Sequence, residues 1–497
     1  MQRRSRPPEH EEPLRRRPTR IVGDGETSEF YSPAMSTEAD VIVIGAGAAG
    51  LSAAAALGEA GLAVAVLEAR ERIGGRIFTL RDPVCQSPVE LGAEFIHGRP
   101  SEIWNLLKRR KVRIREMDGD NWCLIDGHLR PCDFFSEVDE VLEKMDGQKP
   151  DQSFLEFIDD CCPQSANHRQ QQAREWAIRY VSGFNAADPA IVGVHWLVKG
   201  MRADDKIEGD RVFRAQQGYA VVIDIFRQQM DESGVTVQTG TVVDSIQWRP
   251  GHVEVSGRGP SGAATVSALR VLITVPLGVL QARSDEKGTI RFSPKLPEQK
   301  QNAIRNVIMG QAVRVSLRFR ERFWEDLPRI NDKDTKTMAK MSFLFSQDDW
   351  FPTWWTCLPD KFPFLVGWAP FHSAERLSGR NESFVVEQSV ESLHHLLGVS
   401  VQDLYALLEH AYFHDWQNDP FSRGAYSYGK AGAGDAQAAL ARPVQTTLFF
   451  AGEATDTGGH NGTVHGAIAS GRRAATEITK AAASGKSVEW ASRRPRH

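Results

Sequence analysis

Residues 40–76 constrain the fold of this chain more than any other stretch, because a strand pattern, a glycine-rich turn, a helix pattern and an acid follow in a fixed order. Residues 41–44 are apolar and β-branched, which predicts a buried strand. Gly45, Gly47 and Gly50 follow at GxGxxG spacing. In such a turn the first glycine permits a tight bend, the second lets the backbone approach a pyrophosphate, and the third lets helix pack on strand.

The residues after the glycines strengthen this interpretation. Residues 51–60 are rich in alanine and predict a helix, which Gly61 would end as a left-handed cap. Residues 62–67 predict a second strand that leads directly to Glu68. A carboxylate at that place can accept hydrogen bonds from both hydroxyls of an adenosine ribose. The order of elements therefore predicts a dinucleotide-binding site on an α/β fold.

A second glycine turn follows at Gly74 and Gly75, and it ends in Arg76. The guanidinium of Arg76 can reach the same pyrophosphate with two hydrogen bonds, and we assign Arg70 to the cofactor site as well. An ordinary surface turn is the plainer interpretation, but the neighbouring Glu68 argues against it. At this point the chain resembles the flavin-containing amine oxidase family, which includes monoamine and polyamine oxidases, histone lysine demethylases and L-amino-acid oxidases. In that family this opening binds FAD.

The end of the chain carries a second family signature, LFFAGEATDTGGHNGTVHGAIASG. Amides at the start of the small-residue helix in this stretch can stabilise negative charge on a reduced isoalloxazine ring. The resemblance implies that Glu453 reaches the ribityl and pyrophosphate region. It assigns to the cofactor site Gly452, Thr463 and Val464 from the same signature, and the backbone of Val243 beside the adenine. Signatures at both ends of the chain make FAD the expected cofactor.

The resemblance covers residues 38–482 and implies an α/β fold with two domains. These are a Rossmann-like, discontinuous FAD-binding domain and an α+β substrate-binding domain. The expected limits are 38–110, 210–283 and 430–482 for the FAD-binding domain, and 111–209, which reads as helical, and 284–429 for the substrate domain. Residues 401–413 predict a further helix. Residues 1–37 predict a disordered extension in which Met35 is a possible alternative start, and 483–497 predict a polar tail.

Arg314 is the main departure from the family pattern. The aligned residue in the family is a lysine that holds a water against flavin N5 and assists reoxidation by oxygen. An arginine can donate hydrogen bonds and carry charge, but it cannot act as a base near neutral pH. The alternative is that Arg314 is a surface strand residue and that the alignment is displaced by one or two positions.

The resemblance also implies the walls of the substrate site. Tyr426 aligns with one ring of the aromatic cage that guides the amine in monoamine oxidases, and Thr463 takes the place of the second ring, as in histone demethylases. His97 stands where several family members carry a substrate-facing histidine or acid, and a hydrogen-bonded core histidine is an equal alternative. Ala425 replaces the cysteine that binds flavin covalently in monoamine oxidases, so we expect non-covalent FAD. Glu94 is an unusual occupant of its position and receives no role.

The aromatic residues between 341 and 371 can wall an apolar cavity, but a core beneath a sheet is our default interpretation. The net charge of -4 offers no basic field for nucleic acid. The six cysteines show neither CxxC nor metal-ligand spacing, which predicts reduced thiols in the cytoplasm and no metal site. No apolar run is long enough for a membrane span.

The function that the resemblance implies is oxidation of an amine by hydride transfer from the carbon next to nitrogen onto flavin N5. The imine product hydrolyses, and dioxygen takes the electrons to give hydrogen peroxide. The expected partners are a small-molecule amine or amino-acid-like substrate and dioxygen. Two alternatives remain: a flavoprotein dehydrogenase or desaturase with another electron acceptor, because Arg314 replaces the lysine, and a non-catalytic FAD-binding scaffold.

Overall fold

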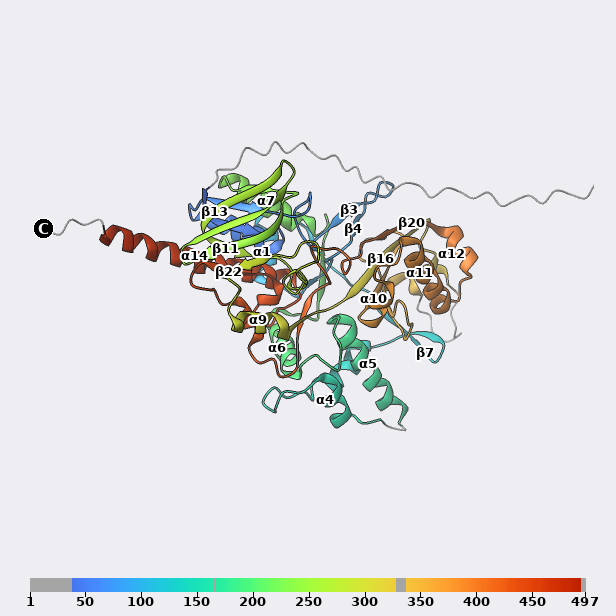
Figure 1. Ribbon diagram of the computed structural model, residues 1–497. Helices are drawn as coiled ribbons and strands as arrows, with labels where there is room; N and C mark the ends of the chain where they lie inside the picture. Colours follow the sequence, from blue (N-terminus) through green and yellow to red (C-terminus); the bar gives the residue numbers. More distant parts are fainter. Residues whose placement is uncertain (1–37, 165–166, 328–336, 493–497) are drawn as a thin grey trace, which may run out of the picture. The chain divides into compact units, whose positions relative to one another are not determined.

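The computed structural model of the protein describes residues 38–164, 167–327 and 337–492 (Figure 1). The predicted extension 1–37, with its possible start at Met35, lies outside the described residues, as do residues 493–497 of the predicted tail. Residues 483–492 of that tail continue the last helix, α14 (Val464–Ser492).

The first sheet has eight strands and carries the GxGxxG turn. Its order is β10 (Thr236–Gln238), β2 (Val64–Leu67), β1 (Glu38–Ile44), β13 (Gly262–Ile273), β12 (His252–Gly259), β11 (Val242–Arg249) and β14 (Arg291–Ser293), with β22 (Leu448–Phe450) also paired to β13. β1 runs parallel to both β2 and β13, as the predicted strand–helix–strand unit requires. β22 also joins β13 in parallel, so the second signature enters the same sheet as the first.

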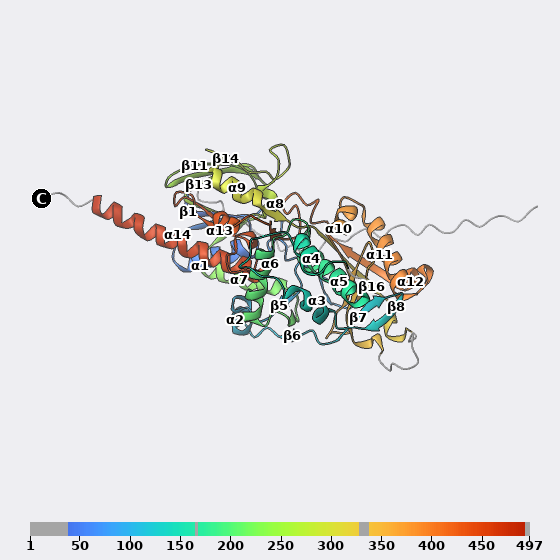
Figure 2. The ribbon, with the colours of Figure 1, turned by 90° about the horizontal axis from the view of Figure 1, so that it is seen from below.

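Helices cover both faces of this sheet. On one face, Val41 and Val43 pack in the same cluster as residues of α1 (Ala48–Glu59), α2 (Ser101–Arg109), α7 (Ala220–Glu232) and α14. On the other face, Ile42 and Ile44 pack with residues of α8 (Leu277–Leu280), α9 (Glu298–Asn306) and α13 (Ala436–Ala441). Residues 41–44 of β1 are all apolar because water reaches neither face of the sheet there. Figure 2 shows α14 running alongside α1, which it contacts.

The second sheet has seven strands, all from the part of the chain predicted as the substrate domain. Its order is β20 (Leu408–Phe413), β16 (Ala312–Phe319), β19 (Phe364–Pro370), β18 (Thr353–Thr356), β17 (Met341–Phe345), β7 (Asp120–Ile125) and β8 (His128–Pro131). One face packs on α3 (Phe134–Leu142), α4 (Phe154–Cys161), α5 (His168–Phe184) and α6 (Val194–Asp204), and the other on α10 (His372–Leu377), α11 (Glu382–Leu397) and α12 (Val401–Leu407). Phe343 and Phe345 point to the first face and Leu344 to the second, so this aromatic-rich segment is mostly core, as predicted.

Three small sheets join segments that are distant in sequence. They are β3 (Thr79–Arg81) with β4 (Pro88–Glu90), β5 (Ile96–His97) with β9 (Val212–Ala215) and β6 (Ile114–Glu116), and β15 (Val307–Met309) with β21 (Ser427–Gly429). The pairing of β15 with β21 brings the start of β16 close to Tyr426, because Gly310 and Tyr426 are hydrogen-bonded through their backbones.

Two secondary-structure predictions were wrong. Residues 111–209 were expected to be helical, yet β6, β7 and β8 precede the helices there. Asp126 and Gly127 form the turn between β7 and β8 and both have positive φ, so this Asp-Gly pair was a hairpin signal in the sequence. Residues 401–413 were expected to form one helix, but the chain changes from α12 to β20 at Leu408, because β20 pairs with the edge of β16.

The prediction of reduced thiols was wrong for two of the cysteines. Cys123 and Cys132 form a disulfide across the β7–β8 hairpin, whose pairing brings their Cα atoms to 5.8 Å. The disulfide was not predicted, because residues 111–209 were expected to be helical and no hairpin was expected between Cys123 and Cys132. The cytoplasmic location, which rested on reduced thiols, stays a prediction. Within the described ranges, the structure contains no helix with the length and apolar character needed to cross a membrane.

Candidate active site

The two glycine turns lie against each other at the end of β1. Gly50 must be glycine, since a Cβ there would lie 1.9 Å from the carbonyl oxygen of Gly45. At Gly47, by contrast, the nearest atom to an added Cβ is Gly75 Cα at 4.0 Å, so the space before it is open. The N–H of Gly74 donates to Ala46 O at 2.7 Å and holds the second turn on the first. The open backbone at the N-terminus of α1 therefore suits the close approach of a pyrophosphate.

Glu68 is held directly beside these turns. It follows β2, it is 4% exposed, and its Oε2 accepts from Ala46 N–H at 2.7 Å. Its Oε1 accepts from the backbone N–H of Arg70 at 2.9 Å. Each carboxylate oxygen can accept more than one hydrogen bond, so Glu68 keeps capacity for the hydroxyls of a ribose.

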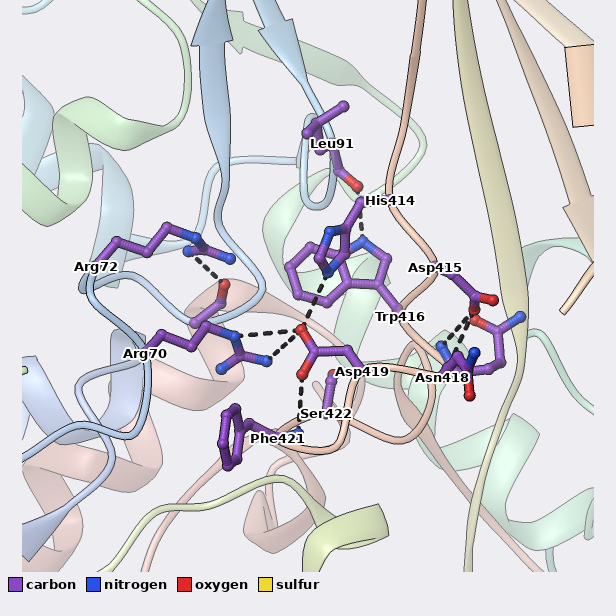
Figure 3. Close-up of polar contacts among 12 residues, drawn as sticks. Arg70, Arg72, Leu91, His414, Asp415, Trp416, Asn418, Asp419, Phe421 and Ser422 are labelled. Carbon is purple, nitrogen blue, oxygen red and sulfur yellow. Dashed lines mark hydrogen bonds and ion pairs between the residues drawn. The ribbon is translucent and has the colours of Figure 1, made fainter. Parts of the chain in front are cut away.

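The guanidinium of Arg70 turns toward Asp419, as Figure 3 shows. Arg70 Nη2 lies 2.8 Å from Asp419 Oδ2, which His414 Nε2 also contacts at 3.1 Å. Burial acts to raise the pKa of Asp419, but the His414 contact and the Arg70 charge outweigh it and hold that pKa well below its usual range. Asp419 was not predicted as part of the site. It fixes Arg70 from a segment far away in the sequence, and the contact of Arg70 with a cofactor stays a prediction.

Arg72 and Trp416 reinforce the same junction (Figure 3). Arg72 donates to Gly75 O at 2.9 Å, and its guanidinium lies 3.9 Å from the ring centre of Phe78. Burial, followed by the charge of Arg70, lowers the pKa of Arg72 to about 10. Trp416 Nε1 donates to Leu91 O at 2.7 Å. Arg72 thus braces the second glycine turn, and Trp416 fixes the segment before Asp419 against Leu91.

The two family signatures meet at Arg76 and Glu453. Arg76 Nη1 lies 3.0 Å from Glu453 Oε1 and also donates to Ala425 O at 2.7 Å. The other oxygen of Glu453 accepts from Ser427 Oγ at 2.6 Å and from the backbone N–H of Gly462 at 3.0 Å. The buried carboxylate thus ties the opening motif to the start of α14.

The remaining predicted cofactor residues surround this ion pair or lie on the same sheet. Gly452 has φ of 132°, and the nearest atom to an added Cβ is Thr274 O at 4.0 Å, which leaves open space at the end of β22. The Thr463 hydroxyl donates to His460 O at 2.7 Å and accepts from Gly466 N–H at 3.0 Å, so it stabilises the first turn of α14, which begins at Val464. Val243 lies farther along the sheet on β11, where it pairs with Gly257.

Tyr426 lies against Gly462, the residue before Thr463: a Cβ on Gly462 would be 3.1 Å from the Tyr426 ring. The Tyr426 hydroxyl donates to Phe184 O at 2.7 Å. Trp368, which the sequence argument did not single out, lies parallel to Tyr426 with ring centres 6.5 Å apart and planes 9° apart. Trp368 Nε1 donates to Gly183 O at 3.0 Å, so consecutive carbonyls at the end of α5 hold both rings.

Arg314 is buried on β16, which excludes the alternative of a surface strand residue. Its Nη2 lies 2.6 Å from Glu94 Oε2, and its Nη1 donates to Gly92 O at 3.2 Å. Glu94 Oε1 lies 2.7 Å from Arg214 Nη2, and Trp355 Nε1 donates to Glu94 at 3.0 Å. Burial raises the pKa of Glu94, but Arg214 and then Arg314 lower it further, so it stays below its usual value.

This cluster of Glu94, Arg214, Arg314 and Trp355 carries a formal charge of +1, because two arginines face one carboxylate. Arg314 is buried and only 12% of the Arg214 side chain is exposed, so the excess positive charge lies largely out of water, where it is costly. Sequence reasoning missed the cluster, although the acidic residue at Glu94 was noted as unusual.

His97 lies on β5 and is half-buried, and burial lowers its pKa. Its ring meets Phe95 edge-on with centres 6.1 Å apart. Burial, followed by the charges of His460 and His97, lowers the pKa of His465 to about 3, so His97 lies near the first turn of α14. Its position agrees with either prediction, a core histidine or a residue that faces the substrate.

A model of the family described as flavin containing amine oxidoreductase matches residues 48–479 of the chain. The chain belongs to this family. It is therefore an FAD-dependent oxidoreductase of the amine oxidase type, and its family implies a flavin cofactor, as predicted. The glycine turns, Glu68 and the open backbone at Gly47 and Gly452 fit such a group.

Comparisons with individual proteins agree with the match to the family model. The chain is 30% identical to lysine-specific histone demethylase 1 homolog 2 of Arabidopsis thaliana, over 90% of this chain but only 59% of that protein. It is 28% identical to polyamine oxidase 3 of Oryza sativa subsp. japonica, over 88% of each chain. A solved structure of putrescine oxidase bound to putrescine has a TM-score of 0.72, 20% identity, and coverage of 89% of this chain and 99% of that one. This likeness confirms the predicted two-domain α/β fold.

Proposed function

We propose that the protein oxidises a small amine at the carbon next to nitrogen and releases an imine, with non-covalent FAD as cofactor and dioxygen as acceptor, giving hydrogen peroxide. The observation that carries the proposal is the Arg76–Glu453 ion pair, which joins the two flavin signatures beside Tyr426 and Thr463. In this proposal residues 38–110, 210–283 and 430–482 hold the cofactor, and residues 111–209 and 284–429 cover its reactive ring.

The residues that would hold FAD fall into three groups. Glu68 would accept the ribose hydroxyls, and the backbone of Val243 would contact the adenine. The turns at Gly45, Gly47, Gly50, Gly74 and Gly75, with the N-terminus of α1, would receive the pyrophosphate. Gly452, Thr463 and Val464 would lie along the flavin. Ala425 offers no sulfur for a covalent bond, which supports non-covalent binding.

FAD, when bound, supplies the acceptor for a hydride and for its electrons. The side chains of this protein position the substrate and exclude water. Tyr426 and Trp368 are anchored on successive carbonyls of α5, so their rings hold a fixed orientation. Rigid aromatic walls of this kind can align a C–H bond for transfer. His97 and Thr463 are the polar groups that we place at the same substrate cavity.

The charge of the Glu94 cluster bears on the protonation of the substrate. Trp355 donates to Glu94 and lies 6.2 Å from Trp368, so the cluster lies behind the aromatic wall. A net positive charge in a dry site disfavours a second cation nearby and lowers the pKa of a bound amine. The cluster would therefore favour the neutral amine, which is the form that reacts.

A second candidate function differs in the electron acceptor. Arg314 is engaged with Glu94 and Gly92 and so has less freedom to hold a water than a lysine would have. This favours a dehydrogenase or desaturase that passes electrons to another acceptor. The substrate class to test first comes from the names of the relatives: polyamines, putrescine, and the side-chain amine of lysine, followed by amino acids.

Anaerobic stopped-flow spectroscopy on the purified protein tests both candidates. Bleaching of the flavin by an amine supports the enzyme, and rapid return of colour with stoichiometric peroxide on mixing with air supports the oxidase. Bleaching followed by slow reoxidation supports the dehydrogenase. If polyamines, lysine peptides, simple amines and amino acids all leave the flavin oxidised, the proposal fails and a non-catalytic flavin-binding role remains.

A further inference from the structure

Cys161 and Cys162 form a dithiol at the end of α4, remote in sequence from the flavin motifs. Their Sγ atoms lie 2.7 Å apart, and both residues are half-buried. The other two free cysteines, Cys85 and Cys357, are also half-buried, and within the described residues neither of them lies against a second thiol. The chain therefore holds one vicinal pair and two natural reference thiols.

The local backbone explains why the two thiols meet. Neighbouring side chains within a helix diverge by about 100°. α4 ends at Cys161. The backbone of Cys162 is no longer helical, with φ of -141° and ψ of 61°, and this turns its side chain back toward Cys161. Arg174 Nη1 donates to Cys162 O at 2.9 Å and to Ile158 O at 2.8 Å, so the helix end is fixed in this conformation.

The two sulfurs have different surroundings. Lys144 Nζ lies 3.4 Å from Cys162 Sγ, where the ammonium can pair with a thiolate as it forms. Burial, followed by the contact with Cys162, raises the pKa of the Cys161 thiol to about 12, so Cys161 keeps its proton near neutral pH. This asymmetry suits an attacking sulfur at Cys162 and a resolving sulfur at Cys161.

We propose that Cys161 and Cys162 are a redox and soft-metalloid site, which a peroxide converts to a vicinal disulfide and which a trivalent arsine oxide bridges through two As–S bonds, while its oxygen leaves as water with the two thiol protons. Cys162 attacks the peroxide and becomes a sulfenic acid, and the peroxide O–O bond breaks to release one water. The Cys161 sulfur then displaces the hydroxyl from Cys162 and forms the S–S bond, with a second water as product. Two thiols lose two electrons and two protons, and one hydrogen peroxide is reduced to two waters. The site requires no amine oxidation, because the peroxide is added from outside.

Peptide mass spectrometry on the full chain tests the peroxide reaction. The protein is treated with a mild reductant that leaves the Cys123–Cys132 disulfide intact, freed of reductant, exposed to a small excess of hydrogen peroxide and then alkylated. The peptide that contains both cysteines is expected to lose two hydrogens, and neither of its cysteines can then be alkylated. Its thiols should become unreactive to alkylation about tenfold faster than the thiol of Cys85 or Cys357. Oxidation of this peptide no faster than Cys85 overturns the proposal.

Three variants provide the controls. Cys161→Ser and Cys162→Ser should each abolish one-to-one binding of phenylarsine oxide, measured by intact mass, whereas Cys85→Ser should keep it. Lys144→Met leaves both thiols in place and should slow the peroxide reaction several-fold. The proposal is also overturned if phenylarsine oxide does not bind a chain in which both Cys161 and Cys162 can be alkylated. It is likewise overturned if the one-to-one binding persists in either serine variant. An unchanged peroxide rate in Lys144→Met overturns the attacking role of Cys162.

Discussion

Arg314 Nη2 lies 2.6 Å from Glu94 Oε2, inside the protein and next to the carbonyl of Gly92. The residue that the sequence analysis aligns with the family's lysine is thus an ion-paired arginine, and the alignment itself stays a prediction. The carboxylate of Glu94 and the guanidinium of Arg314 neutralise each other, because neither charge would be stable alone in a buried site. Arg214 completes the pairing on the opposite oxygen of Glu94.

Arg314→Lys should accelerate reoxidation of the reduced flavin by dioxygen. A lysine is shorter and leaves room for a water beside Glu94, and its ammonium is a compact donor. Stopped-flow mixing of the amine-reduced protein with oxygenated buffer measures the rate, and Arg318→Lys on the same strand is the matched control. A rate that is unchanged or slower would count against the assignment of Arg314 to the flavin site.

Glu94→Gln should destabilise the protein by about 3 kcal/mol, because the buried Arg314 and the largely buried Arg214 would lose their shared carboxylate. Urea unfolding of the flavin-bound protein measures the loss. Glu140→Gln is the control, since Glu140 pairs with Arg169 on the exposed surface and its loss should cost less than about 1 kcal/mol. Equal effects of the two substitutions would show that the Glu94 cluster adds no special stability.

Trp368→Ala should raise KM for an apolar amine about tenfold while flavin content stays unchanged, because one aromatic wall of the slot is removed. Trp368→Phe should recover part of the loss. Steady-state kinetics with a reference amine make the measurement. Trp350→Ala is the matched control, since Trp350 packs on Phe384 at the other face of the second sheet. A KM that Trp368→Ala leaves unaltered would remove Trp368 from the substrate slot.

The ionisation of Glu90 should lower the free energy of unfolding of the protein as the pH rises from 5 to 8. Burial raises the pKa of Glu90 to about 7, although the hydrogen bonds from Thr79 and the Tyr219 N–H act in the other direction. The pKa of Glu90 is higher in the folded protein than in the unfolded chain. The contribution of Glu90 to the free energy of unfolding is therefore complete below about pH 4.5, and it is lost as the pH passes 7, by about 3 kcal/mol in all. Urea unfolding at pH 5 and pH 8 should show that Glu90→Gln costs more at pH 5. A cost that does not vary with pH would refute the shift.

Local patterns predicted the nucleotide-binding part of the fold well. The glycine spacing from Gly45 to Gly50 and the position of Glu68 depend on neighbours in sequence, and β1, α1 and β2 were found where the pattern placed them. Tyr426 lies against Gly462, the neighbour of Thr463, while the roles of Tyr426 and Thr463 in the substrate site stay predictions.

What the sequence did not reveal depends on contacts between distant segments. Glu94, Arg214 and Arg314 come from three separate strands or loops, and the two arginines meet their shared carboxylate only after the sheets have formed. Trp368 was one of many aromatic residues in its segment, and only the carbonyl at Gly183 distinguishes it from the core. The Cys123–Cys132 disulfide followed from a hairpin whose Asp126-Gly127 turn was overlooked.

The most direct test of the account is the fate of the flavin when the purified protein is denatured with acid. The Arg76–Glu453 junction and Ala425 predict a yellow protein that carries about one FAD per chain and releases all of it into the supernatant. A colourless protein that takes up no FAD on refolding would contradict the central claim. Colour that stays with the precipitated chain would contradict non-covalent binding.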